Sequence, residues 1–449
     1  MSKVIKVKKG LDIQLIGGAE KKLAKSEDSK TYALKPADFH GLTPKLLVKE
    51  NEKVKKGTPL FHDKYRPDIV FVSPVSGEVT AINRGERRRI LEVVVTPDGN
   101  NSSEEFQKVN PSSLSKETVK ETLLKSGLWP FIRQRPYDVI ANPKDEPKAI
   151  FISGFDSAPL AADVEFILSG EEKAFQYGVY ALQKLTAGKV NLGLNAASPP
   201  SILEKTEGIS VTKYQGKHPA GNVGIQIHNT NPILKGDVVW YIKPADVVQV
   251  GKLFLNGVLD FSRVIALAGS EIKEPQYYKT HIGASIRSIA GNKVSDKKVR
   301  YISGNVLTGS QVSIESYFGF YDTELTVIPE GDRYNFLGWA MPNLDKFSFS
   351  RTFFSWLTPK KKYALDTNFN GGERAFVMSG EYEKVFPMEI LPVLLLKAIL
   401  AEDIEKMENL GIYEVAPEDF ALCEFVCTSK IESQEIVRKG LDLMLKEMS

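Results

Sequence analysis

Two kinds of periodicity follow one another along the chain. Between residues 4 and 95, short runs with alternating apolar and polar positions, such as KVIKVKKG and RILEVVVT, are separated by glycine and proline turns. This is the pattern of half-buried β-strands. The polar stretch TPDGNNSSEEFQKVNPSSLSKE has the composition of a linker. After it, KETVKETLLKSG has the spacing of an amphipathic helix that ends at Gly127.

Strands and helices alternate from Lys148 onward. AIFISGF predicts a buried strand, residues 171–185 a helix, and KVNLGLN a further strand. This order predicts a parallel crossover unit. Residues 261–329 return to short strands around one short helix, which favours a β-grasp arrangement. An aromatic loop follows, and residues 390–407 and 432–447 predict helices.

These patterns predict a multi-domain protein of the α+β class, since 449 residues are enough for several cores. In the first part, VKKGTPLFHDK and SPVSGEV punctuate the two similar halves of a small β-sandwich. We expect a β-rich N-terminal part with this module over residues 1–100, an α/β domain over 101–255, a β-grasp domain over 256–330, and an aromatic loop with a helical domain over 331–449.

Bulk composition excludes several classes of protein. Lys and Arg number 59 against 56 Asp and Glu, which is not the charge balance of a nucleic-acid-binding chain. The longest apolar run, residues 390–400, is too short to cross a bilayer, and the N-terminus lacks the apolar region of a signal peptide. Two cysteines fit a reducing compartment. We expect a protein of the cytosol or of the cytosolic side of a membrane.

Signals for metal and nucleotide sites are weak. No two of the five histidines have the i,i+4 spacing that places two imidazoles on one metal. Cys423 and Cys427 stand among apolar residues in ALCEFVCTSK, which favours buried free thiols over a metal or cluster site. GFDSAPLAAD follows a strand but lacks the GxGxxG spacing, so an ordinary turn is favoured over a phosphate site. We expect no metal in this chain.

The stretch LDKFSFSRTFFSWLTPKKKY sets crowded aromatic residues beside a basic run. Such a stretch fits either a core or a contact with a membrane surface or a membrane partner, and the sequence leaves both open. The candidate contact residues are Phe353, Phe354, Trp356, Lys360, Lys361 and Lys362.

A resemblance to a known family rests on stretches that occur in the same order. They are VKKGTPLFHDK with SPVSGEV, FISGFDSAPLAAD, KHPAGNVG, FSRTFFSWL, NGGERAFV, GEYEKVFPMEILPVLLL and EDFALCEFVC. Together they resemble the A subunits of bacterial Na⁺-translocating NADH:quinone oxidoreductases, essentially from end to end. The resemblance implies a barrel-sandwich hybrid module near the N-terminus. It also implies a distant similarity to the flavin- and NADH-binding subunit of respiratory complex I, to the C subunits of Rnf complexes, and to their soluble-ligand-binding β-grasp domain.

One departure from the complex I relative bears on function. In that relative the helix ending in SGL is followed by glycines that hold the flavin phosphate, whereas this chain reads SGLWPFIRQRPY. Close backbone approach to a phosphate needs residues without Cβ. The cluster cysteines of the relative are also missing, apart from Cys423 and Cys427. The resemblance therefore implies a redox-cofactor fold that holds no tightly bound cofactor and serves quinone instead.

A quinone head is flat, with two carbonyl acceptors, so its site needs aromatic walls and one or two donors. GLWPFIRQRPY supplies both, and PADFHGLTP offers a second contribution. The alternative is that the bulky residues only fill the space of the lost flavin. The predicted quinone-binding residues are Trp129, Phe131 and Tyr137 as walls, Arg133 and Arg135 as donors, and Phe39 and His40 from the N-terminal part.

The resemblance implies a complex that oxidises NADH, reduces ubiquinone and exports Na⁺. We expect this chain to be a peripheral subunit on the cytoplasmic face of the bacterial inner membrane, contributing to ubiquinone binding and to assembly and inactive alone. Flavins, an iron–sulfur cluster and the NADH site are expected in partner subunits. Two alternatives remain: a flavin- or NADH-binding electron-transfer subunit, or a purely structural scaffold.

Lys64 raises the separate question of a swinging-arm lysine. In biotinyl and lipoyl domains that lysine stands at an exposed hairpin tip, midway between the two halves. Here seven positions separate Gly57 from Lys64 and ten separate Lys64 from Pro74. We therefore predict an unmodified lysine.

Overall fold

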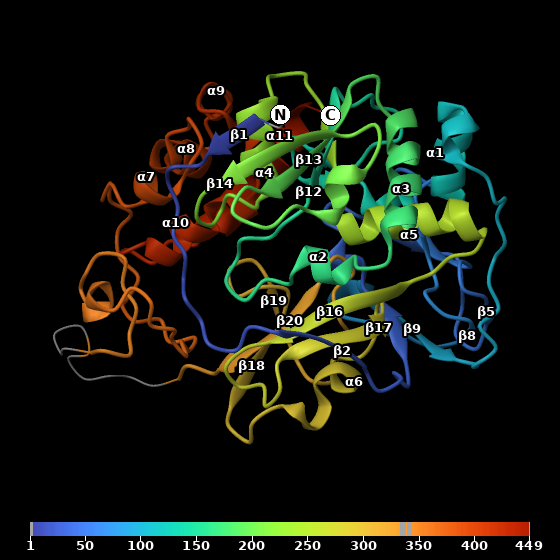
Figure 1. Cartoon of the computed structure of the whole chain (residues 1–449), viewed down its shortest axis with the longest axis horizontal. Coiled ribbons are helices and arrows are strands. Elements are labelled where there is room, and N and C mark those ends of the chain that lie inside the picture. Colours follow the sequence, from blue (N-terminus) through green and yellow to red (C-terminus); the bar gives the residue numbers. More distant parts are fainter. Residues whose placement is uncertain (1–2, 333–337, 339–342, 449) are drawn as a thin grey trace.

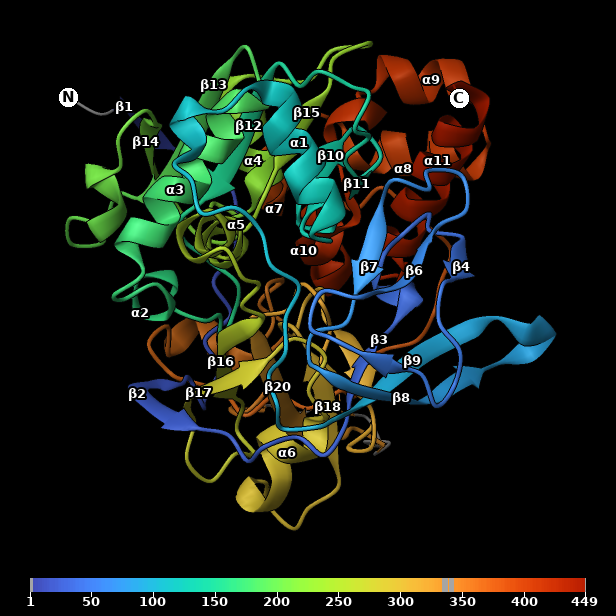
Figure 2. The same cartoon turned by 90° about the vertical axis from the view of Figure 1, so that its right-hand side faces the viewer.

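The computed structural model describes residues 3–332, 338 and 343–448. Four sheets are present in this part of the chain, of seven, six, four and three strands. Figure 1 shows the seven-stranded sheet with its helices above the six-stranded sheet, and the C-terminal helices packed beside the upper layer. The architecture is mixed α/β, and the two smaller sheets, built from N-terminal strands, share one apolar core with the first face of the seven-stranded sheet (Figure 2).

The seven-stranded sheet has a parallel centre. Strands β12, β13, β14 and β1 run parallel, and β15 pairs parallel with the other side of β12. The winding therefore reverses between β12 and β15, and β10 and β11 extend that side antiparallel. In spatial order the strands are β1 (Lys3–Lys6), β14 (Ser210–Gln215), β13 (Lys189–Asn195), β12 (Ala149–Ser153), β15 (Val239–Tyr241), β10 (Arg133–Arg135) and β11 (Val139–Ile140).

Both faces of the centre of this sheet are buried, each in a different core. Because successive side chains of a strand point to opposite faces, Ile150 and Ile152 join one apolar cluster while Ala149 and Phe151 join another. The first cluster includes α1 (Lys116–Lys125), α3 (Glu172–Lys184) and α5 (Pro244–Asn256); the second includes α4 (Val223–Thr230) and the C-terminal helices. A strand buried on both faces reads as a continuous apolar run, as AIFIS does.

The sequence predicted the first helices and strands of this domain correctly. Helix α1 ends at Lys125, and Gly127 follows with φ +71°, a left-handed conformation that favours glycine. Helices α3 and α5 pack closely at Gly251, where a Cβ would stand 1.7 Å from the carbonyl oxygen of Ala174. The predicted crossover β12–α3–β13 is present, with the two strands parallel.

The six-stranded sheet is also mixed, and strand β2 at its edge comes from the N-terminus of the chain. Strand β2 pairs parallel with β17, and β1 belongs to the seven-stranded sheet. We predicted these first strands to belong to the N-terminal part, because the hydrophobic pattern of a strand does not indicate which other strand it pairs with. In spatial order the strands are β19 (Ser310–Val312), β18 (Val299–Ser303), β20 (Glu324–Pro329), β16 (Ser262–Ala268), β17 (Gln276–His281) and β2 (Glu20–Lys25), beside the short helix α6 (Ile286–Ala290).

The N-terminal module contains the two smallest sheets. Lys64 lies just after β6, at the start of the loop to β7, and its side chain is exposed. Its modification state stays a prediction. The strands are β3 (Tyr32–Leu34), β9 (Ile90–Pro97), β8 (Gly77–Arg84) and β5 (Lys53–Val54) in one sheet, and β4 (Pro44–Leu46), β6 (Pro59–Asp63) and β7 (Val70–Val72) in the other.

The C-terminal region is helical, as predicted, but the first predicted helix is two. It breaks at Glu402, which has φ +53°, and Asp403 caps the next helix by accepting a hydrogen bond from the Lys406 N–H. Cys423 and Cys427 are buried free thiols, which confirms their prediction. The helices are α7 (Tyr382–Val385), α8 (Pro392–Leu400), α9 (Ile404–Asn409), α10 (Ala421–Val426) and α11 (Ser433–Met448).

Candidate functional site

The predicted quinone stretch forms a short 3₁₀ turn, Trp129–Phe131, followed by strand β10. Proline at position 130 suits the start of such a turn because it has no N–H to leave unpaired. In β10, Arg133 and Arg135 stand two residues apart and therefore on the same face, opposite Gln134. Arg133 is in register with Tyr241 of the neighbouring strand β15.

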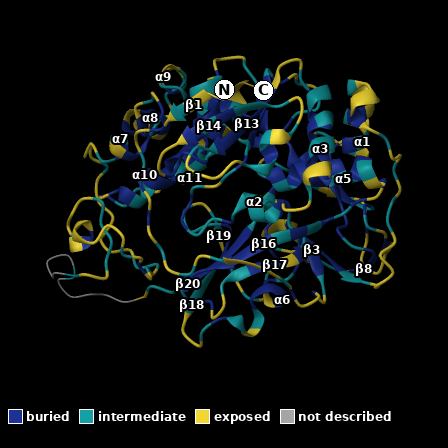
Figure 3. Cartoon of the chain, in the orientation of Figure 1, coloured by how far each residue is buried: buried dark blue, intermediate teal, exposed yellow. Residues whose placement is uncertain are grey.

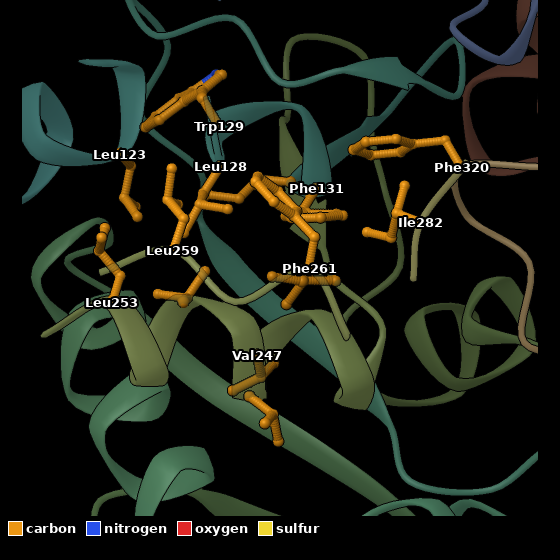
Figure 4. Close-up of a cluster of buried hydrophobic side chains, with 14 of the residues drawn as sticks. Leu123, Leu128, Trp129, Phe131, Val247, Leu253, Leu259, Phe261, Ile282 and Phe320 are labelled. Carbon is orange, nitrogen blue, oxygen red and sulfur yellow. The ribbon is translucent and has the colours of Figure 1, made fainter. Parts of the chain in front are cut away.

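The aromatic side chains of the turn lie in the core. Trp129 and Phe131 are almost completely buried, and Figure 4 shows both among the apolar side chains of α1, α5 and the loop around Leu259. The Trp129 Nε1–H donates to the Ala141 carbonyl oxygen at 2.8 Å. Phe131 stacks on Phe320 with ring centroids 4.8 Å apart. Neither ring presents a free face in this arrangement.

Phe39, from the N-terminal part, joins the same group of rings. Its centroid lies 4.8 Å from that of Phe320 and 5.7 Å from that of Tyr321. The structure thus brings Phe39 and Phe131 to one shared ring, although 92 positions separate them in the sequence. Phe39 is also buried. The neighbouring Asp38 accepts the Phe320 N–H, and burial raises the pKa of this carboxyl to about 6.

Arg135 is completely buried, and its two terminal nitrogens bind the C-terminal region, while Nε has no hydrogen-bond partner among the described residues. Its Nη1 donates to Asp419 Oδ2 at 2.7 Å and to the Glu414 carbonyl oxygen at 2.8 Å, and its Nη2 donates to Glu418 Oε1 at 2.7 Å. Gly224, at the start of α4, leaves room for this pair, because a Cβ there would stand 2.3 Å from Nη1. Both terminal nitrogens of Arg135 are therefore committed to protein partners.

Arg133 is different, since a quarter of its side chain (25%) is exposed. Its guanidinium lies between the rings of Tyr241 and Tyr321, at 5.4 and 5.2 Å from their centroids. Nη2 pairs with Asp138 Oδ1 at 2.7 Å, while within the described residues Nε and Nη1 make no hydrogen bond. The cationic group thus keeps free donors beside two aromatic faces.

Both tyrosine hydroxyls around Arg133 are donors to protein oxygens. The Tyr321 hydroxyl donates to the Pro130 carbonyl oxygen at 2.6 Å, and that of Tyr241 donates to Asp138. Burial raises the pKa of both tyrosines above the ordinary value, so they stay neutral at physiological pH. Both hydroxyls are therefore neutral and bonded to protein oxygens.

A chain of contacts links Arg133 to the remaining candidates. Tyr137 follows in the β10–β11 turn, and its carbonyl oxygen accepts from Arg438 Nη2 at 2.7 Å. Arg438 also pairs with Asp442 at 3.0 Å, which in turn lies 2.7 Å from His40 Nε2. His40 and Tyr137 are half-buried. Nothing in the sequence marks Arg438 and Asp442 for this contact, because their i,i+4 charge spacing is ordinary for a helix.

The turn that carries Tyr137 has an unusual backbone. Tyr137 and Asp138 have φ +77° and +55°, a left-handed conformation uncommon for residues other than glycine. It is stabilised by contacts on both sides, through the Arg438 bond to the Tyr137 carbonyl oxygen and the Arg133–Asp138 ion pair. Such backbone conformations persist only where the surroundings hold them, and they gather at functional sites.

Two clefts on the described residues lie elsewhere. One of about 170 Å³ is lined by Phe347, Tyr363 and Lys361 among others, and one of about 350 Å³ by Glu424, Glu432 and Glu435 among others. Neither is lined by any of the seven predicted quinone residues. The smaller is below the roughly 300 Å³ at which pockets for small molecules begin.

The loop after β12 is closed by its own contacts. Ser157 Oγ accepts the Gly221 N–H at 2.8 Å, and a Cβ at Gly221 would stand 2.6 Å from the Ser157 N. Asp156 accepts the Ala158 N–H in an ordinary turn, as the missing GxGxxG spacing suggested. In the part of the chain that the structure describes, no group of His, Cys, Asp and Glu side chains has the arrangement of a metal site.

The aromatic loop is partly open to solvent. Phe354 and Trp356 are 41% and 50% exposed, while Phe353 is half-buried. Figure 3 shows exposed residues gathered along this segment, at the left of the molecule. Lys360 and Lys362 are exposed, and Lys361 pairs with Asp345 at 2.7 Å. No helix of the described residues is long and apolar enough to span a bilayer.

Comparison with known proteins covers nearly the whole chain. Three family models match it: the NqrA N-terminal barrel-sandwich hybrid domain over residues 5–98, the NqrA second alpha/beta domain over 114–259, and the NQRA C-terminal domain over 264–313. The first match confirms the barrel-sandwich prediction. The similarity of the α/β domain to the complex I relative and the β-grasp assignment stay predictions. An NAD⁺-reducing [NiFe]-hydrogenase structure aligns with 49% of this chain and 48% of its own at 11% identity and a TM-score of 0.37, too low to support an argument.

Curated relatives align from end to end. They are named as the A subunits of Na(+)-translocating NADH-quinone reductases: those of Photorhabdus laumondii and Neisseria meningitidis are each 38% identical, and that of Pasteurella multocida is 39% identical. Each alignment covers 99% of this chain and 100% of the relative. Identity of this extent over full length confirms the resemblance seen in the sequence. The chain belongs to the NqrA family, the A subunits of the Na⁺-translocating NADH-quinone reductases.

Proposed function

We propose that this subunit contributes one wall of the ubiquinone site of a Na⁺-translocating NADH-quinone reductase, and that Arg133 is its hydrogen-bond donor to the quinone. The observation that carries the proposal is the placement of Arg133 between Tyr241 and Tyr321 with donors left free. A hydrogen bond from a guanidinium to a carbonyl that gains negative charge on reduction is charge-assisted, and contributes roughly 1.5–3 kcal/mol.

The proposed site differs in detail from the seven residues that the sequence suggested. Arg133, Tyr137 and His40 have exposed surface and belong to it directly. Trp129, Phe131 and Phe39 support it from the core, through Phe320 and Tyr321. We assign Arg135 to ion pairing with Glu418 and Asp419. Because Arg133 keeps exposed surface beside the two tyrosine rings, we propose that a partner subunit completes the site.

We further propose that the chain holds no tightly bound flavin and that electrons reach the quinone from a partner. Support comes from Trp129 and Phe131, which fill the place where the complex I relative has glycines and leave no backbone approach for a phosphate. The relatives are named as subunits of a Na⁺-translocating NADH-quinone reductase. We therefore infer that the NADH site and Na⁺ transport belong to other subunits, with this chain peripheral on the cytoplasmic face.

The aromatic loop is the proposed contact with a membrane partner. Phe354 and Trp356 expose large apolar surfaces beside Leu357, which is 58% exposed. The basic residues Lys360 and Lys362 flank them. Exposed aromatic residues with a basic rim are typical of protein and membrane contacts.

A scaffold subunit is the second candidate function, and a specific observation favours it. Four of the seven predicted quinone residues, Trp129, Phe131, Arg135 and Phe39, are buried and stabilise the fold. In that case the quinone binds wholly on partner subunits. The two functions predict different effects of removing the Arg133 guanidinium on the affinity of the complex for ubiquinone.

The test is a quinone titration of the purified reductase that carries Arg133→Ala in this subunit. We expect the apparent affinity for ubiquinone to fall about 10- to 100-fold with the complex intact. Arg287→Ala is the matched control, because Arg287 is an exposed arginine paired with one carboxylate, Glu315, on the six-stranded sheet side. Unchanged quinone affinity in an assembled Arg133→Ala enzyme would leave the scaffold function.

A further inference from the structure

The longest strand pair of the N-terminal module ends in a strongly basic tip. Strands β8 and β9 pair from Gly77 with Pro97 to Arg84 with Ile90, and Figure 2 shows them extending away from the rest of the molecule. The loop Gly85–Arg89 is held by backbone bonds from the Gly85 N–H to the Arg89 oxygen and from the Arg89 N–H to the Glu86 oxygen. It is a fixed projection and not a loose tail.

Four of the six residues at this tip, positions 84–89, are arginines. Arg84, Arg87, Arg88 and Arg89 are all exposed, with Glu86 as the single acidic residue among them. The whole chain has 14 arginines against 45 lysines, so more than a quarter of all its arginines lie at the tip. Arg87 and Arg88 have φ +52° and +60°, a left-handed backbone that closes the turn tightly.

These arginines lack the acidic partners that most of the other described arginines have. Seven others form ion pairs with Asp or Glu, whereas within the described residues none of the four does. The one side-chain bond that the described structure shows for them runs from Arg84 Nη1 to the Arg88 carbonyl oxygen at 3.1 Å. Folding therefore places an uncompensated cluster of guanidinium groups at the end of a rigid arm.

We propose that the β8–β9 tip binds the phosphate groups of anionic phospholipids, independently of the quinone contact. A guanidinium presents paired donors that match phosphate oxygens, and clustered basic residues are drawn to an anionic leaflet. The tip carries one exposed apolar side chain, Leu91 (45% exposed), beside Gly85. A specific protein interface needs about 800 Å² on each partner, which a six-residue tip does not offer. A surface of mobile headgroups needs no such complementary shape.

The proposal is tested by sedimentation of the full chain with vesicles. One set contains phosphatidylcholine alone and the other phosphatidylcholine and phosphatidylglycerol in roughly equal parts, at low and at high salt. We expect binding to the anionic vesicles that high salt weakens, since exposed charges are screened. The variant R87Q/R88Q/R89Q should bind them about 100-fold more weakly, at roughly fivefold for each arginine.

The matched control removes the same charge from the same module. K53Q/K55Q/K56Q neutralises three lysines near β5, off the tip, and should keep anionic binding within about threefold of the parent. Equal thermal unfolding of both variants and the parent shows that the fold is retained. Equal vesicle binding by the arginine variant and the parent overturns the proposal, as does equal binding of the parent to neutral and anionic vesicles. Loss of partner subunits from the arginine variant, without any vesicle binding by the parent, would mean an acidic protein surface instead.

Discussion

The guanidinium of Arg135 and the carboxylate of Asp419 stand 2.7 Å apart, and neither side chain has any exposed surface. Their pairing joins strand β10 to the turn before α10, across 284 positions of sequence. Glu418 adds a second carboxylate at 2.7 Å. A buried ion pair of this kind does not measure net stability, but removal of one partner leaves the other charge buried and unpaired.

Arg135→Ala should therefore lower the free energy of unfolding by about 3–5 kcal/mol. Urea denaturation of the purified chain measures it. Lys125→Ala is the control, because Lys125 pairs with Glu121 on the exposed face of α1, and its loss should cost less than about 0.5 kcal/mol. The double change Arg135→Leu with Asp419→Leu should recover only part of the stability, because Glu418 loses its cation and the Ala416 N–H loses its acceptor. Little loss in the single variant would mean that Arg135 is not held by these carboxylates.

Phe131→Ala should destabilise the chain because Phe131 is buried and stacked on Phe320. Loss of a fully buried phenylalanine costs about 3–5 kcal/mol. Phe354→Ala provides the comparison, since this ring is 41% exposed and its loss should change stability by less than about 1 kcal/mol. Unfolding curves of the two variants should therefore separate clearly. Similar curves would contradict the assignment of one ring to the core and the other to the surface.

Glu324 should make stability depend on pH. Burial, together with the nearby Asp156 carboxylate, raises its pKa from 4.5 to about 8, while Lys243 opposes this shift. The folded chain thus keeps a proton that the unfolded chain releases, so the free energy of unfolding falls as pH rises from about 4.5 to 8. This contribution is on the order of 5 kcal/mol.

Glu324→Gln tests that dependence, because the amide oxygen can still accept the Ala162 N–H and the side chain cannot ionise. The variant should gain stability relative to the parent between pH 5 and pH 9, measured by urea denaturation at each pH. Glu86→Gln, at an exposed position, should follow the parent at every pH. A constant difference between Glu324→Gln and the parent would show that the pKa of Glu324 is the same in the folded and the unfolded chain.

Polar replacement of Phe354 and Trp356 should release the subunit from its partners and leave it folded. Both rings are more than a third exposed, so their loss removes contact area and little core. The measurement is the share of the subunit that co-purifies with the reductase, beside the thermal unfolding of the free chain. The same replacement at exposed Leu234 (69%), on another loop, should have no effect on assembly. Misfolding of the Phe354 and Trp356 variant would place the aromatic loop in the core.

Local pattern determined a large part of this protein. The alternation of β12, α3 and β13, the end of α1 at Gly127 and the burial of Cys423 and Cys427 follow from spacing and neighbouring residue types. Family membership, too, could be read from short motifs in order, and full-length identity with curated relatives confirms it. These features depend on residues close together in the chain, where periodicity and turn chemistry act.

Which of the predicted site residues are buried and which are exposed was decided only by tertiary structure. Arg133 and Arg135 are both arginines on the same face of one short strand. Arg135 is buried in ion pairs with Glu418 and Asp419. Arg133 stays partly exposed to solvent beside the rings of Tyr241 and Tyr321. The sequence likewise could not place β1 and β2 in their sheets. Burial and strand pairing depend on segments hundreds of residues away, and the residue types at one position do not specify which of these will cover it.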